Sequence, residues 1–244
     1  MFKPASHYNW LIFRIVNSEL RARLKKYAKG RLLDIGCGEK PYQEMAAPFI
    51  QKHVGLDHEK TLHNTGNIDL FGTAYNIPVD SECFDTILCT YVLEHLEEPQ
   101  TAIAEAFRVL KNGGYAIYTV PLFWHLHEEP RDFYRYTKHG LKYIFESNGF
   151  HVIECKALTG FFVMVAQETT YYLLRFRRGG KINPLWWLVP PLNILIQALA
   201  YLINFIDRSE EFSMEYIVVA QKQACGVYNS IDSQNDIKII ETKI

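Results

Sequence analysis

Two glycines spaced by one residue, Gly36 and Gly38, directly follow the apolar stretch "LLDI". Glycine tolerates unusual backbone dihedrals and lets a ligand lie against bare backbone. Asp57 ends a second apolar stretch about 20 residues further on, where a carboxylate can accept hydrogen bonds from ribose hydroxyls. Together these residues predict a nucleoside site. The alternative is a plain strand-exit turn at the glycines, with Asp57 capping a helix.

The spacing also limits what the nucleoside is attached to. A dinucleotide fingerprint requires G-x-G-x-x-G, whose last glycine allows close helix packing. Pro41 stands at that last position here. A ligand without a pyrophosphate is therefore favoured.

Short apolar stretches alternate with amphipathic helical patterns and must position these residues. Helical stripes run from Phe13 to Tyr27, from Ile103 to Leu110, and from a Thr137 cap to Gly149. The expected strands are residues 31–36, 53–57, 67–72, 84–90, 114–121, 150–158 and 211–222. Alternation of this kind predicts an α/β fold with a mostly parallel sheet covered on both faces, in which ligands bind beyond the carboxyl ends of the strands.

Bulk properties exclude several classes of protein. The net charge is −1, so no basic field indicates a nucleic-acid partner. Five scattered cysteines indicate free thiols in a reducing compartment, and we predict no metal site. The first twenty residues lack a clean signal-peptide core, because Arg14 and Asn17 interrupt it, so we expect a cytoplasmic protein.

Four motifs in order resemble the class I S-adenosylmethionine-dependent methyltransferases, most closely the type 11 branch. They are "LDIGCG", "GLDHE", "SECFDTILCTYVLEHLEEP" and "EAFRVLKNGGYAIYTVP". The resemblance covers roughly Leu32 to Val152, together with the final strand near residues 214–222. It implies a Rossmann-like three-layer sandwich with a seven-stranded sheet whose last strand is antiparallel. It also implies an enzyme that uses S-adenosyl-L-methionine as cofactor.

The resemblance assigns cofactor roles to particular positions. The methionine part is expected beside Asp34, Gly36 and Gly38, and the ribose on Asp57. The residues expected around the adenine and the reactive end are His58, Thr73, Ala74, Tyr75, Ile77, Thr90 and Tyr91. Relatives often carry an acid where Thr73 stands, and a threonine hydroxyl accepts more weakly from the adenine amino group.

The stretch after the fifth strand, residues 121–137, is expected to overhang the site. His127 is the first candidate for a general base and His95 the second, and the alternative for His95 is a packed histidine bonded to a loop carbonyl. Asp132 and Arg135 are expected to form a structural ion pair. The substrate-side candidates are Trp124, His125, Arg131, Arg135 and Tyr136.

An apolar segment, residues 183–207, is inserted before the final strand. It approaches the roughly 20 apolar residues that span a bilayer, but Pro190-Pro191 are expected to break it, and Asn193, Gln197 and Asn204 interrupt it. A true span would also separate the final strand from its sheet. We therefore expect helices that lie on the inner face of a membrane or cover a lipophilic pocket, and the alternative is a core or dimer-forming helix pair.

We divide the chain into an N-terminal helical segment (1–30), the methyltransferase core (31–158), the hydrophobic insertion (159–210), a final core strand (211–222) and a disordered tail (223–244). The expected function is O-methylation of a small or lipid-linked acceptor. A membrane-anchored protein and a catalytically silent cofactor-binding protein are the alternatives. The sequence identifies neither the acceptor nor the oligomeric state.

Overall fold

The computed structural model describes residues 8–61, 64–177, 180–207 and 210–223. The predicted disordered tail lies outside these residues apart from Gln223. The helices are α1 (Trp10–Tyr27), α2 (Gln43–Ala46), α3 (Pro99–Val109), α4 (Lys138–Ser147), α5 (Phe161–Leu173) and α6 (Leu185–Ile203). The strands are β1 (Arg31–Ile35), β2 (Lys52–Asp57), β3 (Leu70–Phe71), β4 (Phe84–Thr90), β5 (Leu110–Pro121), β6 (Phe150–Ala157) and β7 (Glu215–Lys222).

The strands form one sheet in the order β3-β2-β1-β4-β5-β7-β6. Pairs from β3 through to β5 are parallel, and β7 runs antiparallel to both β5 and β6. The predicted Rossmann-like, seven-stranded sheet is therefore confirmed. The chain leaves β1 toward β2 on one side and later returns to β4 on the other, so the switch point lies between β1 and β4.

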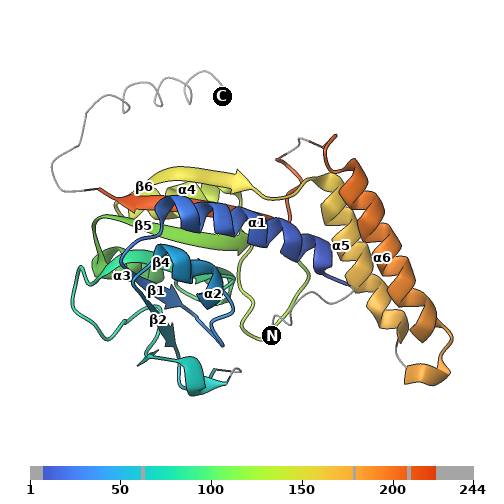
Figure 1. Ribbon diagram of the computed structural model, residues 1–244, viewed down its shortest axis with the longest axis horizontal. Coiled ribbons are helices and arrows are strands. Elements are labelled where there is room, and N and C mark those ends of the chain that lie inside the picture. Colours follow the sequence, from blue (N-terminus) through green and yellow to red (C-terminus); the bar gives the residue numbers. More distant parts are fainter. Residues whose placement is uncertain (1–7, 62–63, 178–179, 208–209, 224–244) are drawn as a thin grey trace.

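Helices cover both faces of the sheet, which gives three layers (Figure 1). The stripe of α1 buries Val16, Leu20 and Leu24 completely, in a cluster that also contains Ala46 of α2. A second cluster joins the opposite face of the sheet to α3 and α4. The predicted Thr137 cap of α4 is confirmed, because its hydroxyl accepts from the Gly140 amide at 3.1 Å.

Two strands differ from their predicted lengths. β3 is an edge strand of only two residues, Leu70–Phe71, although residues 67–72 were expected. Asp69 lies just before it, where its carboxylate accepts from the Gly55 amide at 2.7 Å and its own amide donates to the Gly55 carbonyl at 3.0 Å. β5 begins at Leu110, ahead of the predicted Gly114, because Leu110 already pairs with Phe84 before the register shifts.

The inserted segment forms a helical hairpin, α5 and α6, that projects beyond one end of the sheet with α6 outermost (Figure 1). The predicted break at Pro190-Pro191 is wrong, because α6 continues through both prolines. Each proline removes a backbone donor from the helix. The helix is maintained instead by the packing of its inward side, where Asn193 and Gln197 are fully buried.

These two polar residues do not interrupt the apolar outer face of α6. Gln197 Oε1 accepts from the Leu11 amide of α1 at 3.2 Å, and its Nε2 donates to the Asn193 carbonyl at 3.2 Å. Asn193 Nδ2 lies 3.5 Å from the Thr170 carbonyl of α5. Both side chains therefore tie α6 to the two helices beside it.

Candidate functional site

A cavity of about 1600 Å³ opens beyond the carboxyl ends of β1, β2 and β4. The predicted cofactor residues on its wall are Asp34, Gly36, Gly38, Asp57, His58, Thr73, Ala74, Tyr75, Thr90 and Tyr91. Ile77 is an exception, because it is buried in the core and is not part of this wall. The expectation that Ile77 packs on an adenine ring is not supported by this position.

Backbone amides shape the glycine turn. Gly36 and Cys37 both donate to the Leu56 carbonyl, at 2.9 and 3.0 Å, so the turn is bound to the end of β2. Asp57 accepts from the Gly38 amide at 2.9 Å and from the His58 amide at 2.8 Å, through different carboxylate oxygens. Each oxygen keeps a second lone pair, and Asp57 lies on the cavity wall, so the carboxylate fits a ribose diol.

Position 36 requires glycine because of its backbone conformation and because a neighbouring side chain leaves no space for a Cβ. Its φ is +68°, and a Cβ at this position would lie 2.4 Å from Cγ2 of Val92. Gly113 has a similar φ of +75°, but a Cβ at that position would have no atom within 4 Å.

We expect Gly113→Ala to cost about 1–2 kcal/mol of stability. Gly36→Ala should cost about 1–3 kcal/mol more and weaken cofactor binding. Thermal unfolding and calorimetry of both variants test this, and equal stability losses would contradict it.

Asp34 has a partner that the sequence did not reveal. His53, the second residue of β2, pairs in register with Leu32, which places its Nε2 2.9 Å from an Asp34 carboxylate oxygen. Burial raises the pKa of Asp34, and the hydrogen bond to His53 opposes that rise. His53 therefore fixes the orientation of an acid on the cavity wall. The register of parallel strands, which local patterns do not specify, creates this pair.

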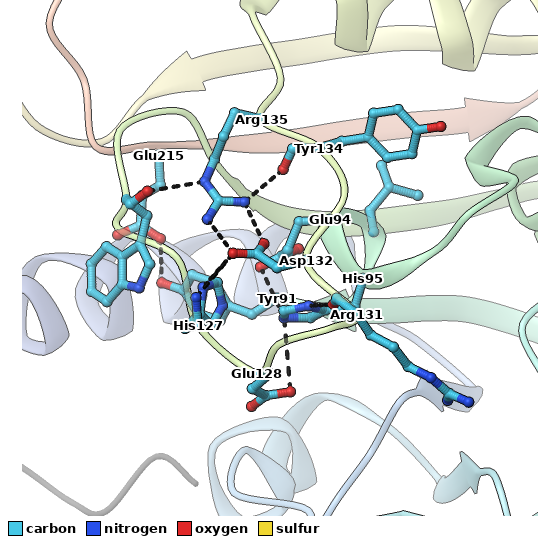
Figure 2. Close-up of polar contacts among 12 residues, drawn as sticks. Tyr91, Glu94, His95, His127, Glu128, Arg131, Asp132, Tyr134, Arg135 and Glu215 are labelled. Carbon is cyan, nitrogen blue, oxygen red and sulfur yellow. Dashed lines mark hydrogen bonds and ion pairs between the residues drawn. The ribbon is translucent and has the colours of Figure 1, made fainter.

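His95 faces the cavity from the short turn Leu93–His95 that follows β4. Its Nδ1 lies 2.5 Å from the Arg131 carbonyl, in the loop after β5 (Figure 2). A carbonyl only accepts, so Nδ1 carries the proton and Nε2 is left as an acceptor. His95 is thus bonded to a loop carbonyl, as expected for a histidine with a structural role. It also lines the cavity, as a base must.

Glu94 lies beside this imidazole and is fully buried. Its Oε1 is 3.9 Å from His95 Nε2, and among the described residues neither carboxylate oxygen has a hydrogen-bond partner. Burial raises the pKa of Glu94 to about 8. Sequence reasoning missed this residue, because "LEH" does not reveal which of its side chains turns inward.

The raised pKa of Glu94 makes stability depend on pH. The folded carboxyl keeps its proton at pH values where the unfolded one, with a pKa of about 4.3, has lost it. The contribution of Glu94 to stability therefore falls as pH rises from about 4.3 to about 8, and is constant above that. Glu94→Gln should flatten this decline in the unfolding free energy. A pH series of denaturant titrations measures the slopes, and identical slopes in both proteins would contradict the expectation.

His127 does not line the main cavity, contrary to its rank as first base candidate. It borders a small separate hollow with Tyr91, Glu94, Pro121 and Trp124. Its ring packs edge-on against His95, with 4.7 Å between centroids. Burial lowers the pKa of His127. The loop thus places His127 against the His95 ring, outside the main cavity.

Asp132 and Arg135 form the expected ion pair, with two contacts at 2.6 and 2.8 Å (Figure 2). Asp132 also accepts from the His127 amide at 3.0 Å, and hydrogen bonds from Arg135 hold the pKa of Asp132 well below its usual range. Arg135 donates further to the carbonyls of Trp124 and His125. The pair thus fixes the shape of the loop.

The substrate-side candidates divide into two groups. Arg131 lies on the cavity wall, and its side chain points away from the polar cluster (Figure 2). The four that are not on that wall are Trp124, His125, Arg135 and Tyr136. Trp124 and His125 stack 5.5 Å apart and contact Tyr171 of α5, while the Tyr136 hydroxyl donates to the Leu93 carbonyl at 3.0 Å. Their positions favour a structural role.

One wall of the cavity was not predicted. It comes from the first half of α1 and from α2, and consists of Trp10, Phe13, Arg14, Asn17, Tyr42 and Met45. The α1 residues recur at three- and four-residue steps beside the buried stripe, a signal that the sequence does carry. No sequence motif marks this aromatic and basic wall. The part of the cavity beside it has room for an acceptor in addition to the cofactor.

Glu94, His95 and His127 also offer possible metal ligands, since one ligand atom from each lies within 4.8 Å of the others. Two imidazoles and a carboxylate are a donor set that transition metals accept. The sequence analysis predicted no metal site, so metal dependence has to be measured along with activity.

Comparison with known proteins agrees with this geometry. The methyltransferase domain family matches residues 33–118. An uncharacterized methyltransferase, YcgJ of Bacillus subtilis, is 31% identical over 98 residues, which cover 36% of this chain and 39% of that protein. The ubiquinone biosynthesis O-methyltransferase of Thiobacillus denitrificans is 27% identical over 48% of this chain and 53% of its own length. The chain thus matches about half or less of these curated relatives.

A solved structure shows the same fold over a longer stretch. Phosphoethanolamine N-methyltransferase 2 of Haemonchus contortus, in complex with S-adenosyl-L-methionine, superimposes with a TM-score of 0.55 at 19% identity. The superposition covers 89% of this chain and 56% of that one. Motifs, sheet order, cavity and comparisons agree: residues 33–118 match the methyltransferase domain family, and the chain resembles the class I S-adenosylmethionine-dependent methyltransferases of the type 11 branch, which use S-adenosylmethionine as cofactor.

Proposed function

We propose that this protein transfers a methyl group from S-adenosylmethionine to an oxygen of a small or lipid-linked acceptor at the cytoplasmic face of a membrane. The observation that carries the proposal is the orientation of His95, whose Nδ1 is bonded to the Arg131 carbonyl while the ring faces the cavity. The ubiquinone O-methyltransferase relative supports oxygen as the methylated atom.

The cofactor contacts in this proposal follow the predicted roles. Asp34, Gly36 and Gly38 border the methionine part, and Asp57 accepts from the ribose hydroxyls. The residues assigned to the adenine and reactive ends are His58, Thr73, Ala74, Tyr75, Thr90 and Tyr91. The bound cofactor supplies an already activated sulfonium methyl, so the protein mainly has to align the acceptor and remove its proton.

His95 is the proposed base. With the cofactor bound, its Nε2 would accept the proton of the acceptor hydroxyl, so the O–H bond would break as the oxygen gains the methyl group, whose bond to sulfur would break to leave S-adenosylhomocysteine. Glu94 lies 3.9 Å away and keeps its proton up to about pH 8, so it stabilises the resulting imidazolium only in its deprotonated form. His127, the first candidate from the sequence, packs on His95 and becomes the second candidate for the base.

Transfer of labelled methyl tests this function. Protein, methyl-labelled S-adenosylmethionine and a cell extract are incubated, and the products are partitioned between water and an organic solvent. We expect label in a product that resists nuclease and protease. A parallel reaction with a metal chelator shows whether the Glu94, His95 and His127 cluster acts through a metal. No acceptor-dependent transfer in any fraction would contradict the proposal.

A further inference from the structure

The outer face of α6 is an uninterrupted apolar surface. Leu188, Leu195, Leu199 and Leu202 are between 54% and 62% exposed and recur at helical spacing, with Trp187 64% exposed at the start of the helix. Among the described residues, α6 is the one helix long and apolar enough to span a bilayer, with a mean hydropathy of 1.5. Only 22% of its most apolar window is buried, unlike the core helix of a soluble protein.

The inner side of α6 is fastened to the folded domain. Leu11 of α1 packs with Val163 and Ala166 of α5 and Ala200 of α6 in one buried cluster. Because α1 also covers the sheet, α6 cannot leave this packing to cross a membrane alone. Its length of about 28 Å, at 1.5 Å per residue, instead offers a long contact parallel to a lipid surface.

Charge on the turn between α5 and α6, and on α6 itself, favours one sign of surface. From Thr169 to Ile206 the sequence has no acidic residue, and its four basic residues are Arg175, Arg177, Arg178 and Lys181. Arg178 lies outside the described residues, while Arg175 and Lys181 are exposed at the turn between the helices. Arg177 covers the Trp186 ring at 4.0 Å, and Trp187 Nε1 donates to the Lys181 carbonyl at 3.3 Å. Basic and tryptophan side chains together suit the interface of an anionic bilayer.

The same surface adjoins the cavity through α1. Trp10 and Arg14 line the cavity and also contact Tyr201 of α6, with 6.2 Å between the two ring centroids and the guanidinium 5.7 Å from the Tyr201 ring. Tyr201 is 46% exposed beside the leucine face. The apolar surface of α6 is thus separated from the aromatic wall of the cavity by a single layer of contacting side chains.

We propose that the outer face of α6 lies in the surface of an anionic lipid bilayer, and that the acceptor is an amphipathic lipid that reaches the cavity along α1. The acceptor half of this proposal rests on the proposed methyltransferase function, and the docking half does not. Lying flat buries the leucine face in the lipid boundary while the basic turn meets anionic headgroups.

Sedimentation of the full chain with vesicles tests the docking half. We expect binding to phosphatidylcholine–phosphatidylglycerol vesicles that weakens with salt, and much weaker binding to phosphatidylcholine alone. Leu195→Gln with Leu199→Gln should lower the binding about tenfold or more. Arg175→Gln with Lys181→Gln should lower it roughly 5- to 30-fold and reduce its salt dependence. Tyr143→Gln, at a site on α4 that is 68% exposed, is the matched control and should bind as wild type does.

Cofactor affinity, measured on each variant, shows that the cavity remains folded. Wild-type protein that ignores anionic vesicles at low salt overturns the docking half. A dimer that the leucine variant dissociates would also overturn it, because a second copy of the chain would then cover α6.

The acceptor half is tested by methyl transfer. In vesicles of total cellular lipid, labelled methyl should enter the lipid phase, and less of it should do so with the leucine variant. Label confined to the water phase, with vesicle binding intact, overturns the acceptor half alone, whereas absence of all transfer counts against the proposed function.

Discussion

His95→Ala is expected to lower turnover by about 10²–10⁴-fold, the usual contribution of a positioned general base. The effect follows from the Nδ1 bond to the Arg131 carbonyl, which leaves Nε2 as an acceptor toward the cavity. Affinity for S-adenosylmethionine should stay within about threefold of wild type, because no cofactor-binding contact is removed. Single-turnover rates and calorimetry on the same preparation separate the two quantities.

Two further histidine variants control this experiment. His139→Ala changes an exposed histidine on α4 and should leave turnover unchanged. His127→Ala should reduce turnover less than His95→Ala, because His127 packs behind the base. Full loss with His127→Ala and near-normal turnover with His95→Ala would reverse the assignment.

Asp57→Ala is expected to weaken S-adenosylmethionine binding by about 1–3 kcal/mol, roughly 5- to 150-fold. The carboxylate fixes the Gly38 and His58 amides and offers its remaining lone pairs to the ribose, so its loss affects both the turn and the ligand. Asp57→Asn keeps one oxygen and should lose less. Asp80→Ala removes an exposed acid elsewhere and serves as the control. Unchanged calorimetric affinity in Asp57→Ala would exclude it from the ribose site.

The parts of the site that were predictable are those set by local sequence. The succession of strands and helices along the chain follows from alternating apolar stretches, and the positions of Gly36, Gly38 and Asp57 at strand ends place them at one edge of the sheet. Parallel strands bring such ends together whatever else the chain does. This local logic accounts for Gly36, Gly38 and Asp57. The role of Ile77 came instead from the family resemblance, and its side chain lies in the core.

The parts that were not predictable depend on contacts between distant segments. His53 reaches Asp34 only through the register of β1 and β2. His127 ranked above His95 because it lies in the stretch expected to overhang the site, and only the fold of that loop around Asp132 shows that His95 lines the cavity and His127 does not. The helix through Pro190-Pro191 is likewise maintained by packing on α1 and α5, which outweighs local propensity.

The most direct test of the account is a single-turnover measurement. Wild-type protein is loaded with methyl-labelled S-adenosylmethionine, mixed with vesicles of total cellular lipid, and stopped at intervals to separate S-adenosylhomocysteine from the intact cofactor. We predict that S-adenosylhomocysteine forms only when vesicles are present, that the label appears in a lipid, and that His95→Ala slows both. Bound cofactor that stays intact with every lipid and cell fraction, or that decays equally without an acceptor, would contradict the account.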